Sequence, residues 1–175
     1  PHHRRAGAAP RHTTHAERRT RSQLRRPRLV GDPHANSVLQ VPMMDAQRAV
    51  RVARYNAEKW NLDADKIGIM GFSAGGHLAS TVGTHYDYGR ARTEDPVEKL
   101  SCRPDFMILM YPVISMSEDF MHKGSAKNLI GIEPSEAQKH RFSNEKQVTS
   151  DTPPTILIHS TDDKGVPVAN SVAFY

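Results

Sequence analysis

The sequence is poor in cysteine and in long apolar stretches, and each shortage excludes a class of structure. Cys102 is the only cysteine among the 175 residues. An intramolecular disulfide is therefore excluded, and so is a metal site built from several thiolates. No stretch approaches the roughly 18 consecutive apolar residues of a transmembrane helix, so we predict no membrane span. The length suits one modest domain.

Acidic residues are scarce only at the beginning of the chain. Residues 1–30 hold nine arginines and one acid, Glu17, whereas the remaining residues hold 15 basic and 18 acidic side chains. The net charge of +5 therefore reflects an arm and not the body of the protein. We expect residues 1–36 to be a basic, disordered arm and residues 37–175 to be one domain.

Three explanations of the arm stay open at this point. Arginine-rich, acid-poor segments can act as organelle transit peptides or bind phosphate backbones. The arm can also be foreign to the domain, because its basic residues are all arginine, whereas the later ones include 8 lysines. No nucleic-acid recognition motif occurs in the sequence, and we expect no nucleic-acid partner.

The pattern after Pro42 predicts an α/β domain. Ala46, Val50, Ala53, Ala57 and Trp60 recur at spacings of three or four, which predicts a helix with Asp45 as its N-cap or first-turn acid. Continuous apolar runs predict strands at 66–70, 106–114 (ended by Pro112) and 155–159. Helices are predicted at 77–85 and 166–175, whereas residues 115–150 are mixed and polar. Such strands, separated by helices, indicate a parallel sheet covered on both faces.

One motif carries chemistry: Gly71-Phe72-Ser73-Ala74-Gly75 matches G-x-S-x-G. It follows a predicted strand and precedes a predicted helix, which is the context of a nucleophile elbow. We interpret Ser73 as a nucleophile and the backbone N–H of Ala74 as an oxyanion donor. The alternative is a glycine-rich turn with an incidental serine.

A serine nucleophile needs a base, and the base needs an acid that orients it. In this type of fold the acid follows a later strand, and Asp162 and Asp163 follow the strand predicted at 155–159. We prefer Asp163. Asp162 as the acid, or both residues as loop caps, are the alternatives.

No histidine follows Asp163, although the base comes last in this chain order. We interpret His77, His85, His122 and His159 as structural or solvated. We therefore expect the chain to be the middle piece of a longer domain, without the base and without the early loop that supplies a second oxyanion donor.

The segment DAQRAVRVARYNAEKWNLDADKIGIMGFSAGGHLAST resembles the acetyl-esterase and lipase-like branch of the α/β-hydrolase superfamily, in which many members are described as xylan or feruloyl esterases. PPTILIHSTDDKGVPVANS resembles the acid loop of that branch, whose second aspartate is the acid. The resemblance covers roughly residues 42–175. It implies an incomplete α/β-hydrolase fold with Ser73, Asp163 and the Ala74 N–H in these roles.

The resemblance implies a carboxylic-ester hydrolase that acts through an acyl-enzyme on Ser73. Its substrate would be a small-molecule or carbohydrate ester with a small acyl group such as acetyl. The alternative is a catalytically inactive fragment of such an enzyme. The chemistry needs only side chains and water, so we predict no cofactor and no metal.

Overall fold

The computed structural model describes residues 40–175. In chain order its elements are α2 (Val41–Tyr55), β1 (Ile69–Phe72), α3 (Ala74–Thr84), β2 (Met107–Met110), α4 (Lys123–Ile130), α5 (Glu136–Phe142), the short 3-10 helix η1 (Asn144–Lys146), β3 (Thr155–Ile158) and α6 (Ala169–Phe174). The predicted basic arm and its boundary lie outside the described residues and stay predictions. Within residues 40–175, no helix is long and apolar enough to cross a membrane.

The three strands form one parallel sheet in the order β1-β2-β3, as the apolar runs predicted. The predicted position of β1 was wrong by about three residues, because Lys66 still belongs to the preceding turn. Its backbone N–H donates to Asp63 O, and its Nζ lies 2.9 Å from an Asp63 carboxylate oxygen. β1 begins at Ile69 and continues through Gly71 and Phe72, which pair with Leu109 and Met110 of β2.

The second predicted strand was too long, since β2 ends at Met110, before Tyr111 and Pro112. Val113 and Ile114 are fully buried, but their N–H groups donate elsewhere, to Ser73 O and to the side chain of Asn170. The backbone after β2 thus leaves the sheet and connects to the turn at Ser73. β3 ends at Ile158, one residue earlier than predicted.

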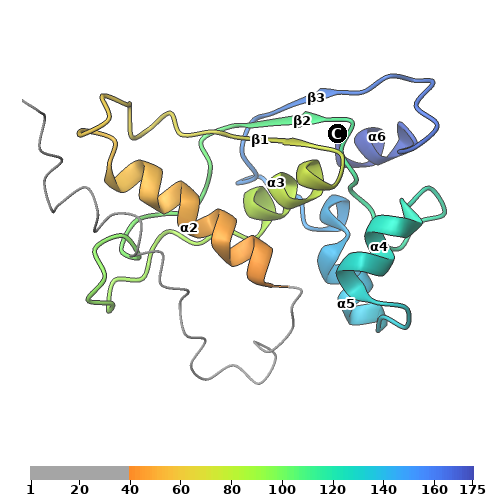
Figure 1. The fold of residues 1–175 in the computed structure, drawn as a ribbon, viewed down its shortest axis with the longest axis horizontal. Helices are drawn as coiled ribbons and strands as arrows, with labels where there is room; N and C mark the ends of the chain where they lie inside the picture. Colours follow the sequence, from red (N-terminus) through yellow and green to blue (C-terminus); the bar gives the residue numbers. More distant parts are fainter. Residues whose placement is uncertain (1–39) are drawn as a thin grey trace, which may run out of the picture. The chain divides into compact units, whose positions relative to one another are not determined.

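The described helices lie on one side of the sheet (Figure 1). On that face Met107 and Leu109 of β2 are fully buried, and they form a core with Ala79 of α3 and Phe174 of α6. The opposite face carries alternate residues of the same strands, which is the expected period of two. Its members are Met70, Phe72, Ile108, Met110, Ile156 and Ile158. We call these six residues the open sheet face.

Helix α2 is confirmed, but its predicted apolar face is only partly buried: Val50 and Ala57 are buried, whereas Ala46 and Ala53 are half-buried. The helix begins at Val41, so Asp45 is neither its cap nor in its first turn, and Trp60 lies beyond its end with 49% of its surface exposed. The side chains that are buried belong to Met43, Gln47, Val50 and Arg51.

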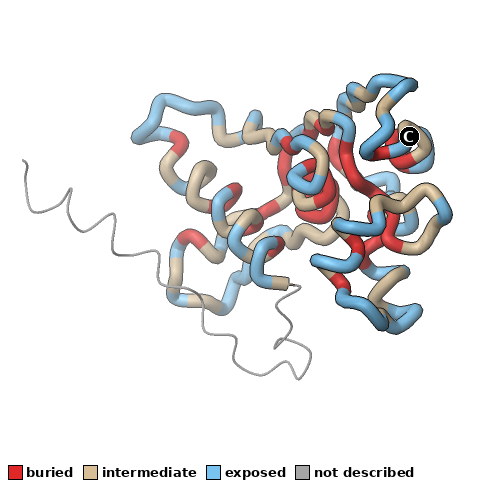
Figure 2. The backbone as a smooth tube through the Cα atoms, turned by 45° about the vertical axis from the view of Figure 1, so that its right-hand side comes forward, coloured by how far each residue is buried: buried red, intermediate tan, exposed pale blue. Residues whose placement is uncertain are grey.

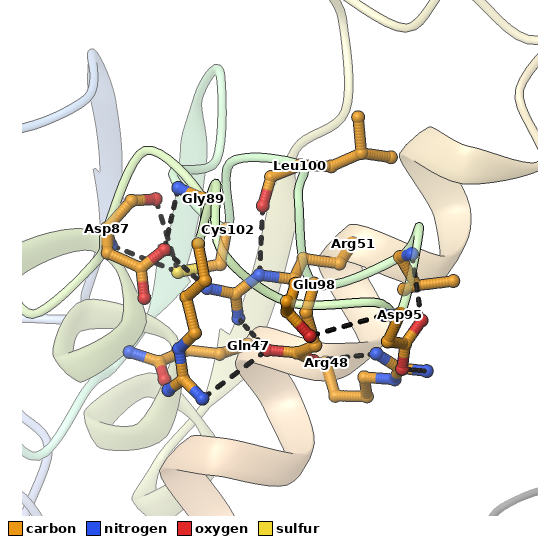
Figure 3. Close-up of polar contacts among 12 residues, drawn as sticks. Gln47, Arg48, Arg51, Asp87, Gly89, Asp95, Glu98, Leu100 and Cys102 are labelled. Carbon is orange, nitrogen blue, oxygen red and sulfur yellow. Dashed lines mark hydrogen bonds and ion pairs between the residues drawn. The ribbon is translucent and has the colours of Figure 1, made fainter.

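Polar contacts explain why a charged residue of α2 is buried. Arg51 donates to Leu100 O and Asp87, and it lies 3.9 Å from Glu98 (Figure 3). Arg48 adds ion pairs with Asp95 and Glu98 at 2.8 and 2.7 Å. These contacts attach the long segment between α3 and β2 to the helix. We call residues 86–105 the α2-bound loop.

The segment 115–150, expected to be mixed and polar, holds α4 and α5 and a second apolar core. A capping box explains why α5 begins where it does: Ser135 Oγ accepts from Gln138 N, and the Gln138 side chain accepts from Ser135 N. A few buried residues, among them Ala126 and Phe142, are spread among exposed and half-buried ones in this segment, and Figure 2 shows this mixture of burial along the backbone. The core comprises Val113, Met116, Ala126, Ile130, Phe142 and Val166, whereas Ile132 is 80% exposed.

Candidate active site

Ser73 lies at the turn between β1 and α3 and has an unusual backbone conformation. Its φ of 50° and ψ of −120° are rare for any residue with a Cβ. Hydrogen bonds to its own peptide groups hold it there: its N–H donates to Met110 O at 3.0 Å, and its carbonyl accepts from Gly76 N and Val113 N. Strained residues that their surroundings fix in this way cluster at functional sites.

Two glycines beside Ser73 are required by space, and a third is not. A Cβ on Gly71 would lie 2.1 Å from Gly75 O, and a Cβ on Gly76 would lie 2.6 Å from Pro112 Cβ. A Cβ on Gly75 would meet nothing within 4 Å. The close approach of strand and helix at this turn therefore depends on Gly71 and Gly76.

Ala74 is the first residue of α3, so its N–H belongs to the group of amides that have no acceptor inside the helix. It donates to no atom of the other described residues. The N-terminus of the helix also carries a partial positive charge. An oxyanion formed beside Ser73 could accept a hydrogen bond from this N–H.

Asp163 lies in the loop after β3, and backbone groups hold its carboxylate. Oδ1 accepts from Gly165 N at 2.8 Å and from Val166 N at 2.9 Å. These two N–H groups are the main reason why the pKa of Asp163 lies below its usual value. Asp162 differs, because it is exposed and its carboxylate accepts from its neighbour Ser160.

Ser73 and Asp163 both follow strands of the same parallel sheet at its carboxyl end. β2 lies between their strands, and Tyr111 follows β2 with a φ of 37°. Its ring centroid lies 6.1 Å from that of Phe72. Ligands of open parallel sheets bind outside this end of the strands.

His77 is buried in packing and does not face solvent. Its Nε2 lies 2.7 Å from Phe142 O, and its Nδ1 lies 3.4 Å from Thr81 Oγ1. Burial lowers the pKa of His77 to about 4, so the ring is neutral near pH 7. Asn144 donates to the carbonyl of His77 and to Thr81 Oγ1, which fixes η1 against α3.

An apolar pocket of about 390 Å³ adjoins the beginning of α3. Ala74 and Gly75 contribute to its wall, together with residues of the 115–150 segment and of the first turn of α2. The apolar side chains in the wall include Met43, Leu78, Met116, Leu129 and Phe142. No sequence pattern marks this pocket, because its wall combines residues from α2, α3, α4 and α5.

Two known proteins are similar in sequence to the chain. It is 41% identical to endo-1,4-beta-xylanase B of Butyrivibrio fibrisolvens over 76% of its length, and 38% identical to acetylxylan esterase of Xylanibacter ruminicola over 82%. It spans only 21% and 28% of these two proteins.

Solved structures share the fold. An acetyl ester-xyloside bifunctional hydrolase from Caldicellulosiruptor lactoaceticus is 51% identical and superposes with a TM-score of 0.75, over 77% of this chain and 49% of that one. A carboxylesterase from Lactobacillus plantarum is 26% identical with a TM-score of 0.60, over 83% and 50% of the two chains. The sheet and its turn at Ser73 thus form part of an α/β-hydrolase fold. The model of the BD-FAE family matches residues 34–175, and the chain belongs to that family.

Proposed function

We propose that the protein is a serine esterase that hydrolyses carboxylic esters through an acyl-enzyme on Ser73. Asp163 is the acid of its catalytic triad, and the N–H of Ala74 is one oxyanion donor. The observation that carries this proposal is the strained backbone of Ser73, which backbone hydrogen bonds hold between a strand and a helix N-terminus.

The reaction follows from this arrangement. Ser73 Oγ attacks the ester carbonyl carbon while its proton passes to a general base, and the carbonyl electron pair moves to the oxygen. The Ala74 N–H donates to that oxygen. The intermediate then collapses, the alcohol leaves with the proton from the base, and the acyl group stays on Ser73 Oγ. Water repeats the sequence and releases the carboxylic acid.

The acid of the triad orients the base and stabilises its protonated form. Asp163 suits this role better than Asp162, because two backbone N–H groups fix its Oδ1 and keep it ionised, whereas Oδ2 accepts from neither of them. An exposed side chain such as Asp162 would have to give up conformational freedom before it could orient a base.

The substrate class is inferred from the relatives. One is named an acetylxylan esterase, and another an acetyl ester-xyloside bifunctional hydrolase. We propose that the substrate is a carbohydrate ester with a small acyl group such as acetyl. The apolar pocket beside Ala74 offers space for the acyl group or for part of the alcohol.

A fluorophosphonate probe tests the nucleophile directly, with mass spectrometry to locate the adduct. The chain would be treated with the probe in the presence and absence of added imidazole, since no histidine follows Asp163. Ser73→Ala removes the proposed nucleophile, and Ser150→Ala, at an exposed serine, is the matched control. Circular dichroism verifies that each variant is folded.

We expect an adduct on Ser73 that is lost in Ser73→Ala and retained in Ser150→Ala. Labelling that requires imidazole would show that the nucleophile is competent and that the chain lacks its base, which is the inactive-fragment alternative. Labelling without imidazole would show that a base is already present. A folded chain that forms no adduct on Ser73 under either condition would contradict the proposal.

A further inference from the structure

His159, directly after β3, lies between the Asp163 loop and α6, and only 3% of its side chain is exposed. Its Nε2 lies 2.9 Å from Val166 O, and its Nδ1 lies 2.8 Å from Ser171 Oγ. A carbonyl oxygen can only accept, so Nε2 carries the proton in the neutral ring. Nδ1 then accepts from the Ser171 hydroxyl, which selects this tautomer.

Val166 connects His159 with Asp163. Its carbonyl accepts from His159 Nε2, and its N–H donates to Asp163 Oδ1 at 2.9 Å. The same ring nitrogen lies 3.5 Å from Asp163 Oδ2, which is longer than an ordinary hydrogen bond. His159 therefore contacts the carboxylate mainly through the peptide groups of Val166, and Oδ2 keeps its capacity to accept from another donor.

The loop that holds Asp163, residues 160–166, depends on the contact between His159 and Val166, because little else in it is buried. Thr161, Asp162, Lys164 and Gly165 are all exposed, whereas Val166 is buried in the second apolar core. Ser171, which fixes the ring of His159, is buried in α6. A continuous series of contacts thus leads from α6 through His159 and Val166 to the Asp163 carboxylate.

We propose that His159 is a positioning residue for Asp163: it holds the peptide of Val166 so that one carboxylate oxygen is fixed and the other faces the base. The proposal rests on the function proposed above for Asp163. It also excludes His159 itself as the general base, because both of its ring nitrogens are engaged in buried hydrogen bonds.

Three variants separate this role from simple packing. His159→Phe keeps the volume and removes both ring nitrogens, whereas His159→Gln keeps an N–H donor that can reach Val166 O. Ser171→Ala removes only the hydrogen bond to Nδ1. His140→Phe, at an exposed histidine, is the matched control. Asp163→Asn gives the effect of losing the acid, and circular dichroism identifies any variant that is unfolded.

Two measurements are made on each variant. The first is the pKa of the Asp163 carboxyl group, measured by carbon-13 NMR on the whole chain. This measurement requires no enzymatic activity. The second is the rate of fluorophosphonate labelling at Ser73 in imidazole. In His159→Phe we expect the pKa of Asp163 to rise towards its ordinary value, because the N–H donors of the loop are no longer held in place. We expect labelling to slow by about 10- to 100-fold, which is the scale of a misplaced catalytic group.

His159→Gln should recover part of both losses, and Ser171→Ala should show a smaller loss of each. The inference is overturned if Asp163→Asn slows labelling while folded His159→Phe and Ser171→Ala match His140→Phe in both measurements. If the pKa of Asp163 rises in His159→Phe but even Asp163→Asn labels at the normal rate, the proposed role of Asp163 is wrong, and the positioning role of His159 in catalysis is overturned with it.

Discussion

At the scale of single residues, the glycines around Ser73 differ in what they make possible. Gly71→Ala would place a Cβ 2.1 Å from a backbone oxygen that cannot move without displacing α3. We expect this substitution to lower the free energy of unfolding by about 1–3 kcal/mol or more. Gly75→Ala meets nothing within 4 Å, and it should be neutral or stabilising by up to about 1 kcal/mol.

Urea unfolding followed by circular dichroism measures both changes. Because the two glycines lie four residues apart in one motif, each is the control for the other. Equal effects of the two substitutions would contradict the view that steric contact, and not the motif as such, requires glycine at position 71.

The sequence was sufficient to single out Ser73, Ala74 and Asp163 as candidates, because their motif and their place after apolar strands are local signals. Their roles stay predictions. The contacts that hold Ser73 were not predictable, since they come from backbone groups of Met110 and Val113, and every residue type except proline offers the same N–H. His159 was interpreted as structural or solvated, and nothing in the sequence connects it to Ser171.

At the scale of elements, α2 stabilises the α2-bound loop through a buried guanidinium. The side chain of Arg51 is only 2% exposed and meets Asp87, Glu98 and a backbone carbonyl. Arg51→Met would leave the Leu100 carbonyl without this donor and remove the guanidinium that pairs with Asp87, whereas Glu98 would keep Arg48. Removing one partner of a buried ion pair costs about 3–5 kcal/mol, and we expect the lower end because Asp87 is 41% exposed.

Arg90→Met is the matched control, since Arg90 pairs with the same Glu98 at 3.7 Å but is 58% exposed. It should cost less than about 1 kcal/mol. Unfolding in urea compares the two variants, and amide hydrogen exchange should show faster exchange in residues 86–105 of Arg51→Met. If the two variants are equally stable, the α2-bound loop does not depend on the buried pair.

Periodicity predicted that α2 exists but not which side of it is buried. The apolar spacing correctly included Val50, but Ala46 and Ala53 are only half-buried, and the buried side also includes Gln47 and Arg51. The partners of Gln47 and Arg51 lie 36 to 49 residues away in the chain, so no local window contains them. The predicted end of β2 was wrong for a related reason. Val113 and Ile114 are as apolar as the strand, but their N–H groups donate to Ser73 and Asn170 and not to a neighbouring strand.

At the scale of the whole molecule, the parallel sheet could be predicted because its strands are continuous apolar runs. The same runs predicted cover on both faces, and the described helices lie against one of them (Figure 1). Sequence shows that a strand is apolar on both sides, but it does not show which residues supply the cover. Met70, Phe72, Ile156 and Ile158 are each exposed by 49% or more.

The open sheet face exposes apolar side chains on all three strands of the sheet, and Ile156 and Met70 are the most exposed of them. Exposed apolar patches of this kind promote self-association, and β1 and β3 also present strand edges within the described residues. We expect residues 1–175 to bind the dye ANS and to associate as concentration rises. Ile156→Lys, at a side chain that is 57% exposed, should reduce both effects without loss of secondary structure. Leu109→Lys, at the fully buried position of the other face, should unfold the protein.

Light scattering and ANS fluorescence across a concentration series measure the two effects. If the chain stays monomeric and binds no dye, or if Ile156→Lys is as disruptive as Leu109→Lys, the face is covered in solution. The register would still hold Ile108 between Met70 of β1 and Ile156 of β3, so the cover would have to contact all three strands at once. Mapping which amides near Ile108 are protected from exchange would then locate it.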